Sequence, residues 1–592
     1  MWDFRKNGYV LEEDFIKSLK GDGEVAAIAG ADPYYGPVRS AEPREEEKTQ
    51  PEEENSGREK TKGKDQLRRL NYSILEENPK DQITEEQAYQ NSTLLYLNTV
   101  ASLYTQVGAN GGGSGLQGTD RGLYDLNTFT TDEAVLPTRG GDWYDGGLWQ
   151  DVFLHKWGTK NDLVKGSWDY LYRVIAQANK SLDKLNEILA KDPENTSVPK
   201  YISEVRAFRA LYYYYLLDMF ARVPLVTSST TAMADVEQSE RSVVFTFVKT
   251  ELEESVADLS DAHSNLPGEY YGRITKPVAY FLLAKLALNA EIYTDDNWTD
   301  GSKPDGKTIK FTVDGAEKNA WEATIAYGTK IKELGYQLAD NFASNFSTKN
   351  ETSVENILTI PMDPNLYKNE FYNLIRSRHY NHGNAYGQGG WNGSSATKEA
   401  LDAFGYGTNA VDPRFDVTYY AGKVEGPKGI IKLDDGTDLE YLPAEISLDM
   451  SGKASEKTAG ARMKKYELDA AATNDGKLQT NDIVLFRYAD VLLMISEAKV
   501  RNGESGNVEL NEVRARAGAS TDVVANLETL LAERLREFAW EGLRRQDLVR
   551  FGKFTRAYTD RPQLQGEANG YTTVFPIHED VLSLNTKLTQ NY

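Results

Sequence analysis

A loop at residues 137–149 concentrates glycine, charged and aromatic residues more densely than any other stretch of the chain. Its glycines let the backbone turn tightly and expose large side chains. Arg139, Asp142 and Asp145 carry groups that form charge-assisted hydrogen bonds with hydroxyls. Such bonds would fix the orientation of a hydroxyl-rich ligand.

Two aromatic residues of the same loop, Trp143 and Tyr144, offer flat faces for stacking. A sugar presents apolar C–H faces with a rim of hydroxyls, so the loop has the mixture that carbohydrate recognition needs. The alternative is a structural loop whose tryptophans plug the surface of the domain. Trp143 favours the binding interpretation, whereas Trp149 and Trp157 favour the structural one.

Two further loops place aromatic residues among glycine and asparagine. Tyr293 and Trp298 follow an apolar helical stretch, and Trp391 stands within the glycine-rich segment 387–393. Long loops on a rigid scaffold are often where binding occurs, and insertions without a binding role are the alternative. We add these three residues to the candidate ligand-binding set. Trp321 begins a predicted helix and is assigned to the core.

The sequence offers no set of catalytic or metal-binding residues. With no cysteines and five histidines, thiolate chemistry is excluded and a His-rich metal centre is disfavoured. No GxSxG elbow, phosphate-binding glycine–lysine loop or HExxH helix is present. Among 90 acidic residues, the proximity of Asp142 and Asp145 gives little support to a glycosidase pair. We expect no enzyme, no catalytic residue and no cofactor; a structural calcium ion in the Asp-rich loops is left without assigned ligands.

Residues 533–550 are dense in paired charges. Glu541 and Arg545 have the i,i+4 spacing of an ion pair on one helix face. Acid–base catalysis by these carboxylates is the alternative, but a structural ion-pair network explains the run better.

The chain of 592 residues carries 67 Lys and Arg against 90 Asp and Glu, a formal net charge of −23. This charge repels phosphate backbones, which argues against nucleic acid as a partner. No apolar run approaches the roughly 20 residues that span a bilayer. Residues 1–15 also lack the apolar core of a signal peptide, so either the chain is cytoplasmic or an export signal has been removed.

Helical periodicity dominates the chain from residue 71 onward. Helices are predicted over residues 167–190, 199–221, 276–293, 321–335, 484–502 and 525–550. The segment 276–293 is apolar on two faces, which is typical of a helix buried between neighbours. Small residues such as Ala207, Ala284 and Ala489 would let helices approach closely, as in stacked helix pairs of the tetratricopeptide type. These patterns predict an all-α fold.

The first 70 residues differ from the rest of the chain. Residues 11–19 are compatible with a short helix, and residues 41–68 are charged with almost no apolar side chains. Such a segment cannot bury enough surface to order itself, so we predict a disordered linker; a docking arm is the alternative. The main domain is expected at 71–592, with parts 71–320 and 321–592 packed as one unit.

Six segments together resemble the SusD/RagB family of Bacteroidetes outer-membrane lipoproteins. They are residues 75–84, 131–143, 486–498, 510–517, 533–548 and 575–592. The first is similar to the start of the family's mature domain, the second to the loop before its ligand site, and the others to its C-terminal part. Their order makes the combination more specific than any single segment.

The resemblance implies an all-α fold in which tetratricopeptide-like helix pairs support a loop-rich ligand-binding face. It also implies a lipid anchor at an N-terminal cysteine, a location at the cell surface in the outer membrane, and pairing with a SusC-like TonB-dependent transporter. Anchoring is therefore expected for the native protein by resemblance alone, with the anchor cysteine absent from this chain. Trp143 and its polar neighbours fall where glycan-binding members place ligand contacts.

The expected function is capture of an oligosaccharide at the cell surface and its delivery to the SusC-like transporter, over which the protein would act as a lid. The alternative is a RagB-like peptide-binding protein of the same transport system, which would favour a roomier cavity. A third hypothesis, a glycoside hydrolase, has no positive support in the sequence.

Overall fold

The structure is a computed structural model that describes residues 89, 91–108 and 110–592. The chain divides into one unit that contains Ser92–Tyr592 and another that comprises Phe4–Asn91. The predicted helix at 11–19 and the predicted linker at 41–68 lie outside the described residues. The description below concerns the unit that contains Ser92–Tyr592.

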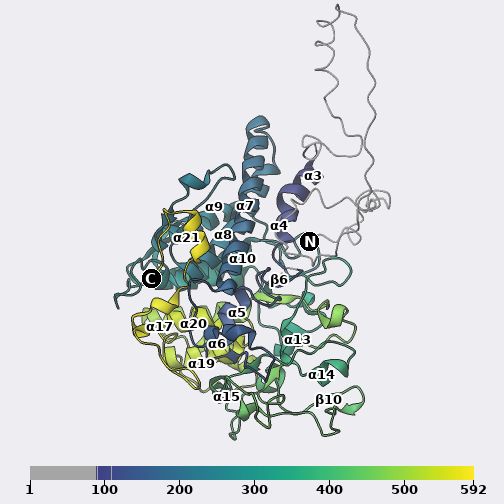
Figure 1. The fold of residues 1–592 in the computed structure, drawn as a ribbon. Coiled ribbons are helices and arrows are strands. Elements are labelled where there is room, and N and C mark those ends of the chain that lie inside the picture. The colour runs from purple at the N-terminus through teal and green to yellow at the C-terminus, as the bar shows by residue number, and fades with distance from the viewer. Residues whose placement is uncertain (1–88, 90, 109) are drawn as a thin grey trace, which may run out of the picture. The chain divides into compact units, whose positions relative to one another are not determined.

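Paired helices form the scaffold, which confirms the predicted all-α fold (Figure 1). The main helices are α7 (Asp162–Lys191), α8 (Val198–Phe220), α9 (Arg241–Ser255), α10 (Lys276–Leu288), α12 (Ala320–Glu333), α17 (Tyr488–Asn502), α18 (Asn507–Arg516), α19 (Leu527–Phe538) and α20 (Arg544–Arg550). In chain order α7 packs on α8, α8 on α9, α10 on α12, α12 on α17 and α17 on α18.

Shorter helices and small two-stranded sheets punctuate the long connections. The short helices are α3 (Ser92–Tyr96), α4 (Ser102–Tyr104), α5 (Leu123–Thr128), α6 (Leu148–Phe153), α11 (Ala290–Tyr293), α13 (Asn373–Ser377), α14 (Tyr380–Asn384), α15 (Lys398–Ala403), α16 (Phe415–Thr418) and α21 (Glu579–Leu584). The sheets pair β1 (Ala134–Val135) with β7 (Ser395–Ala396), β2 (Val223–Pro224) with β3 (Gln238–Ser239), β4 (Lys310–Val313) with β5 (Ala316–Asn319), β6 (Asn356–Ile360) with β14 (Ile483–Arg487), β8 (Tyr419–Tyr420) with β13 (Arg462–Met463), β9 (Gly422–Lys423) with β12 (Glu440–Tyr441), and β10 (Glu425–Gly426) with β11 (Gly429–Ile430), all antiparallel.

Local sequence explains where the long helices begin and end. The side chain of Asn161 accepts hydrogen bonds from the backbone of Leu163 and Val164 and so caps α7. Asn319 and Glu322 form a reciprocal capping box at the start of α12. Helix α17 ends at Gly503, whose left-handed backbone suits glycine.

Three predicted helices are wrong in part. The segment 484–502 begins as strand β14, because β-branched residues there favour extended backbone and are buried against β6. The segment 525–550 is divided into α19 and α20, because Trp540 and Gly542 between them adopt φ angles of 69°. Helix α11 likewise separates from α10 at Asn289.

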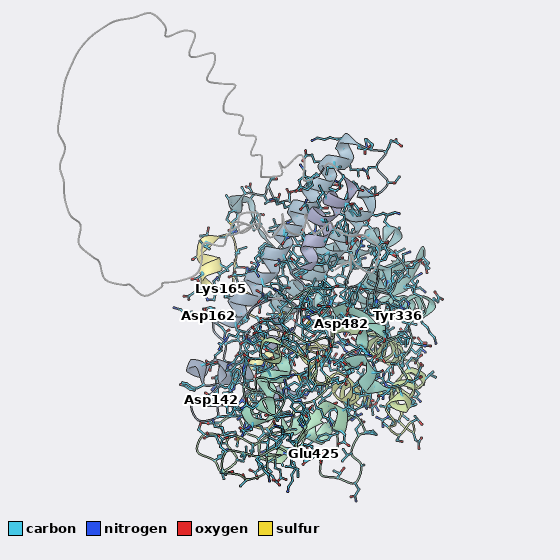
Figure 2. All side chains as sticks on the ribbon, turned by 90° about the vertical axis from the view of Figure 1, so that its right-hand side faces the viewer. Asp142, Asp162, Lys165, Tyr336, Glu425 and Asp482 are labelled. Atoms are coloured by element: carbon cyan, nitrogen blue, oxygen red, sulfur yellow. The ribbon has the colours of Figure 1, made fainter. Side chains whose placement is uncertain are left out.

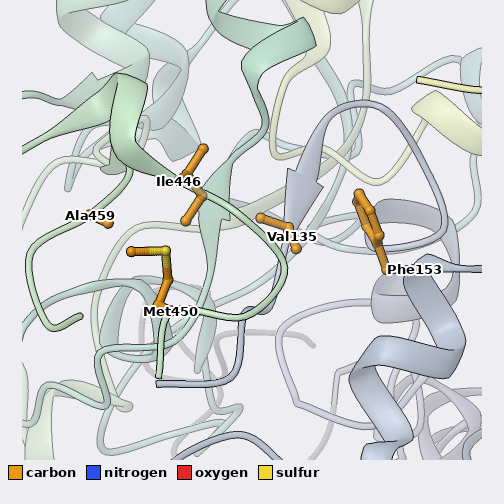
Figure 3. Packing of buried hydrophobic residues seen from close by; sticks show 5 residues of the cluster. All are labelled: Val135, Phe153, Ile446, Met450 and Ala459. Atoms are coloured by element: carbon orange, nitrogen blue, oxygen red, sulfur yellow. The ribbon is translucent and has the colours of Figure 1, made fainter. Parts of the chain in front are cut away.

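A small apolar cluster joins the loop 137–149 to the C-terminal half. Val135 precedes the loop and Phe153 follows it, and they pack with Ile446, Met450 and Ala459 (Figure 3). Both ends of the loop are therefore fixed to residues 446–459, far along the chain (for example, Arg139 and Ala459 are separated by 320 positions).

A buried ion-pair network runs through the C-terminal half. Arg487 pairs with Glu355 at 2.8 Å, with Glu537 at 2.6 Å and with Glu541 at 2.8 Å. Arg414 adds pairs to Glu533 and Glu537, both at 2.7 Å. The structural interpretation of residues 533–550 therefore agrees with the contacts.

The expected pair between Glu541 and Arg545 is wrong. Because the chain leaves the helix between them, Glu541 pairs with Arg487 and Lys465 instead. Arg545 pairs with Asp218 on α8 at 2.8 Å. This separate ion pair joins α20 to α8.

Replacing Arg487 by alanine should destabilise the protein strongly. The change leaves three buried carboxylates without one of their cations, and breaking a buried pair from one side costs about 3–5 kcal/mol. The free energy of unfolding in urea measures the effect. Lys191→Ala, which removes an exposed partner of Glu187 at the end of α7, is the control and should cause no measurable change. Equal stability of the two variants would contradict the structural role of the network.

Candidate functional site

The loop 139–149 folds back on itself at its first residues. The Arg139 and Asp142 backbones exchange hydrogen bonds, with N···O distances of 3.0 and 3.2 Å. Gly140 occupies the left-handed region at φ 67°, which favours glycine. Trp143 follows at φ 61°, an unfavourable conformation for a bulky residue, so its surroundings must hold it there.

Trp143 meets Trp391, a residue from a different predicted loop. The Trp143 Nε1 donates a hydrogen bond to the Trp391 carbonyl at 2.9 Å, and the ring centres lie 6.4 Å apart with planes tilted by 38°. A Cβ atom on Gly393 would lie 2.7 Å from the Trp143 ring, so only glycine leaves room for it. Both tryptophans are partly exposed.

Tyr372 extends this pair into what we call the aromatic platform: Trp143, Trp391 and Tyr372. The Tyr372 ring is edge-on to Trp391, with centres 5.3 Å apart. The Lys477 ammonium lies 5.2 Å from the Tyr372 ring and 5.8 Å from the Trp391 ring. Tyr372 is itself buried, so the exposed apolar faces of the platform are those of Trp143 and Trp391, next to the Lys477 ammonium as a hydrogen-bond donor.

Asp142 supplies a carboxylate beside the platform. It accepts hydrogen bonds from the Tyr380 hydroxyl and from Lys457 Nζ, the latter at 2.9 Å. Although partial burial opposes the shift, these hydrogen bonds hold the pKa of Asp142 below its usual value. The carboxylate is therefore ionised and oriented at neutral pH.

Arg139 lies beneath the surface rather than on it. Its guanidinium is fully buried and donates to the carbonyls of Glu456 at 2.7 Å and Ala459 at 3.0 Å, and to the Ser395 hydroxyl at 2.9 Å. It thereby ties together the segments that carry Lys457 and Trp391. Burial leaves Arg139 no surface to offer a ligand.

The other two polar and aromatic candidates of the loop lie at its outer end. Tyr144 is 52% exposed. Asp145 accepts hydrogen bonds through Oδ2 from Trp149 Nε1 at 2.8 Å and from Arg121 at 2.9 Å. Trp149 itself is buried, as the structural interpretation predicts.

Tyr293 and Trp298 lie at a different place in the fold. Tyr293 is fully buried, and its hydroxyl donates to Asp218 at 2.7 Å. Trp298 stands between two guanidiniums, 5.7 Å from that of Arg222 and 5.9 Å from that of Arg241. Tyr293 contacts residues of α8, α9 and α20, and Trp298 contacts Arg222 and Arg241, so the structure does not bring them to the platform.

Sequence reasoning missed four residues around the platform: Tyr372, Tyr380, Lys457 and Lys477. Tyr380 and Trp391 do belong to the glycine- and asparagine-rich stretch 376–395, which was a usable signal. The two lysines have no such local signal. Among the residues that the structure describes, no group of three or more His, Asp or Glu side chains is arranged to hold a metal ion.

Two buried acids at the base of the loop contact residues on either side of Glu541, a member of the ion-pair network. Asp132 pairs with Arg544 at 2.7 Å, and Glu133 accepts a hydrogen bond from the Trp540 backbone at 2.7 Å. Desolvation raises the pKa of Glu133 to about 8, against the opposing effect of that hydrogen bond. Glu133 therefore holds a proton at neutral pH.

In this chain, paired helices support an aromatic surface that is built from loops. This architecture is typical of helical-repeat binding proteins. A family model described as "SusD family" matches residues 354–592, and another described as "Starch-binding associating with outer membrane" matches residues 81–288. The chain belongs to the SusD/RagB family, as its sequence motifs indicate. This family is non-catalytic, so the chain is not an enzyme.

Relatives of known name agree with this assignment. The chain is 26% identical over 525 residues to the "Starch-binding protein SusD" of Bacteroides thetaiotaomicron, which covers 81% of this chain and 87% of that protein. A "Laminarin binding SusD-like protein" shares its fold with a TM-score of 0.62 at 21% identity, covering 85% of this chain and 99% of the other. A "SusD-like carbohydrate binding protein" from Bacteroides fragilis has a TM-score of 0.65 at 19% identity, with the same coverages.

The pH dependence of stability should reveal the protonated Glu133. Its folded pKa lies above the unfolded value of about 4.3, so the folded state holds a proton that the unfolded chain releases. As pH rises from about 5 to about 8, the wild type should lose stability relative to Glu133→Gln by up to about 1.4 kcal/mol per pH unit. Urea unfolding at a series of pH values tests this, and parallel curves for the two proteins would refute it.

Proposed function

We propose that this protein binds an oligosaccharide at the outer surface of the cell and delivers it to a SusC-like TonB-dependent transporter of the outer membrane. The observation that carries the binding role is the meeting of Trp143 and Trp391. Two loops that each have weak signals for sugar binding place their tryptophans 6.4 Å apart.

The chemistry of the platform suits a sugar. The apolar C–H face of a pyranose stacks on aromatic rings, and its hydroxyls need donors and acceptors at the rim. Asp142 offers an oriented acceptor, and Lys457 and Lys477 offer donors. The ligand-contacting set is therefore Trp143, Trp391 and Asp142, with Tyr144 at the outer edge.

The remaining candidates take supporting roles in this proposal. Arg139 holds the loops from below, and Asp145 fixes Trp149 and Arg121. Tyr293 and Trp298 are left out of the ligand site, because the first is buried and both contact other helices.

Relatives support a glycan over a peptide. The named relatives are described as binding starch, laminarin or carbohydrate, and the two solved structures among them share the fold of this chain. The same proposal includes four features that the family implies: the transporter, the lid role, the outer-membrane location and the lipid anchor. No helix in the described part of the chain is long and apolar enough to cross a membrane.

Replacing Trp143 by alanine should abolish most of the glycan affinity. Loss of a central aromatic contact raises the dissociation constant by at least about tenfold, which corresponds to about 1.4 kcal/mol. Calorimetric titration with malto- and laminari-oligosaccharides and with mixed peptides provides the measurement. The matched control is Trp298→Phe, which should bind as the wild type does. Undiminished binding by a folded Trp143→Ala protein would remove the platform from the site, and saturable binding of peptides alone would favour the RagB-like function.

Native membranes should contain the protein in complex with a large β-barrel partner. Mild detergent extraction followed by affinity purification of the tagged native protein should recover a SusC-like transporter, identified by mass spectrometry. If no detergent concentration recovers the transporter together with the protein, the lid role would be contradicted.

A further inference from the structure

Three buried guanidiniums lie close to the aromatic platform, and we call them the guanidinium cluster: Arg139, Arg378 and Arg462. Each of these residues is at most 2% exposed. The Arg462 guanidinium is 5.1 Å from the ring centre of Tyr441. Burial raises the pKa of the Tyr441 phenol, and the charges of all three arginines oppose that rise. The cluster therefore brings three positive charges to one place in the interior.

The guanidinium cluster has no carboxylate partner in the described part of the chain. Arg139 and Arg462 donate only to backbone carbonyls and to one hydroxyl. Arg378 donates to the Gln388 amide oxygen at 3.2 Å and to the Leu374 carbonyl at 3.3 Å. Burial lowers the pKa of Arg462 to about 10 and also lowers that of Arg139. Buried charges in proteins are normally paired with opposite ones, so the cluster holds positive charge that the protein does not neutralise locally.

A single residue, Gly393, connects the cluster to the platform. Its carbonyl accepts hydrogen bonds from Arg462 at 3.4 Å and from Arg139 at 3.5 Å. The same residue packs against Trp143, since a Cβ atom on it would lie 2.7 Å from that ring. Two of the three cations therefore act at short range on a ligand that stacks on Trp143.

The charges at the surface beside the platform do not cancel the cluster. Asp142 and Glu456 both contact Lys457, at 2.9 and 3.6 Å. Figure 2 shows Asp142 at the edge of the molecule, and its side chain is 43% exposed. Burial and two guanidiniums of the cluster lower the pKa of His379 to about 4, against the opposing charge of Asp434. Counted together, the cluster and Lys457 provide four cations against these three carboxylates.

Lys477 supplies a further cation next to Trp391. Within the described part of the chain its ammonium forms no hydrogen bond and no ion pair, and it lies 5.8 Å from the Trp391 ring centre. The neighbouring carboxylate of Glu370 is buried and accepts hydrogen bonds from the Tyr372 hydroxyl at 2.7 Å and from the Asn474 amide at 3.0 Å. Lys477 is partly exposed, so its ammonium is available to a ligand.

We propose that the platform selects an anionic oligosaccharide, one that carries carboxylate or sulfate groups, and that Lys477 contacts its negative charge. The inference rests on the proposed glycan-binding function and adds the charge of the ligand to it. Neutral amides could donate to the same carbonyls without the cost of burying a charge, so the buried guanidiniums favour an anion at the surface. The net charge of −23 repels an acidic polymer from the rest of the chain, which makes a positive site selective.

Calorimetric titration of the full chain with two matched pairs of tetrasaccharides tests the charge of the ligand. One pair is tetragalacturonate and its neutral methyl ester, and the other is a carrageenan tetrasaccharide and its desulfated form. In at least one pair the acidic member should bind at least about tenfold more tightly at about 0.1 M salt, because hydrogen bonds between charged groups are stronger than those to neutral ones. The advantage should shrink at about 1 M salt, where the screening length falls from about 10 Å to about 3 Å. The pair that responds tells carboxylate from sulfate recognition.

Substitution of Lys477 tests its role in that preference. Lys477→Met keeps the aliphatic stem and removes the charge, so the ratio of acidic to neutral affinity should fall by about tenfold. Lys477→Arg keeps the charge and should retain most of the ratio. Lys191→Met is the matched control, because Lys191 is a 73% exposed lysine at the end of α7, and its ratio should equal that of the wild type. An unchanged ratio in Lys477→Met would overturn the assignment of Lys477.

The outcomes separate the charge of the ligand from the proposed function. Equal affinities within both pairs, or binding of malto- or laminari-oligosaccharides without binding of either acidic probe, would overturn the anionic ligand and leave glycan binding in place. Absence of binding for every oligosaccharide, acidic or neutral, would overturn the proposed function and this inference with it.

Discussion

Arg487 pairs in the interior with three buried carboxylates, those of Glu355, Glu537 and Glu541. Because charges taken out of water need opposite charges at hydrogen-bonding distance, these pairs hold the segment around Glu537 next to the end of β14. From there Arg544 reaches Asp132 and Arg545 reaches Asp218. The C-terminal helices are thereby fastened to the N-terminal ones by charge as well as by apolar packing.

The candidate site inherits its geometry from this arrangement. Asp132 and Glu133 lie directly before β1, which leads into the loop 139–149. Arg139 then binds carbonyls of two distant segments and fixes the platform from below. The strained backbone of Trp143 is tolerated because its ring packs closely against Gly393 and is hydrogen-bonded to Trp391.

Local patterns were sufficient for much of the fold. Helices α7, α8 and α12 begin and end within a few residues of their predicted limits, because apolar periodicity and caps act over a few turns. Prediction failed where distant contacts outweigh local preference. Strand β14 needs β6 as its partner, and the break between α19 and α20, at Trp540 and Gly542, turns Glu541 toward Arg487 instead of Arg545.

The class of the protein and the chemistry of its main loop could be predicted from the residues: an acidic, cysteine-free, helical chain with Trp143 among glycines and aspartates. Which of the candidate residues meet could not be predicted. Trp143 and Trp391 are 248 positions apart, and no local pattern joins them. Arg139 and Tyr293 lie in the interior, which the sequence did not predict. A buried arginine that donates to carbonyls cannot be distinguished in sequence from a surface arginine. Burial and long-range contact are properties of the packed chain, so they could be read only from it.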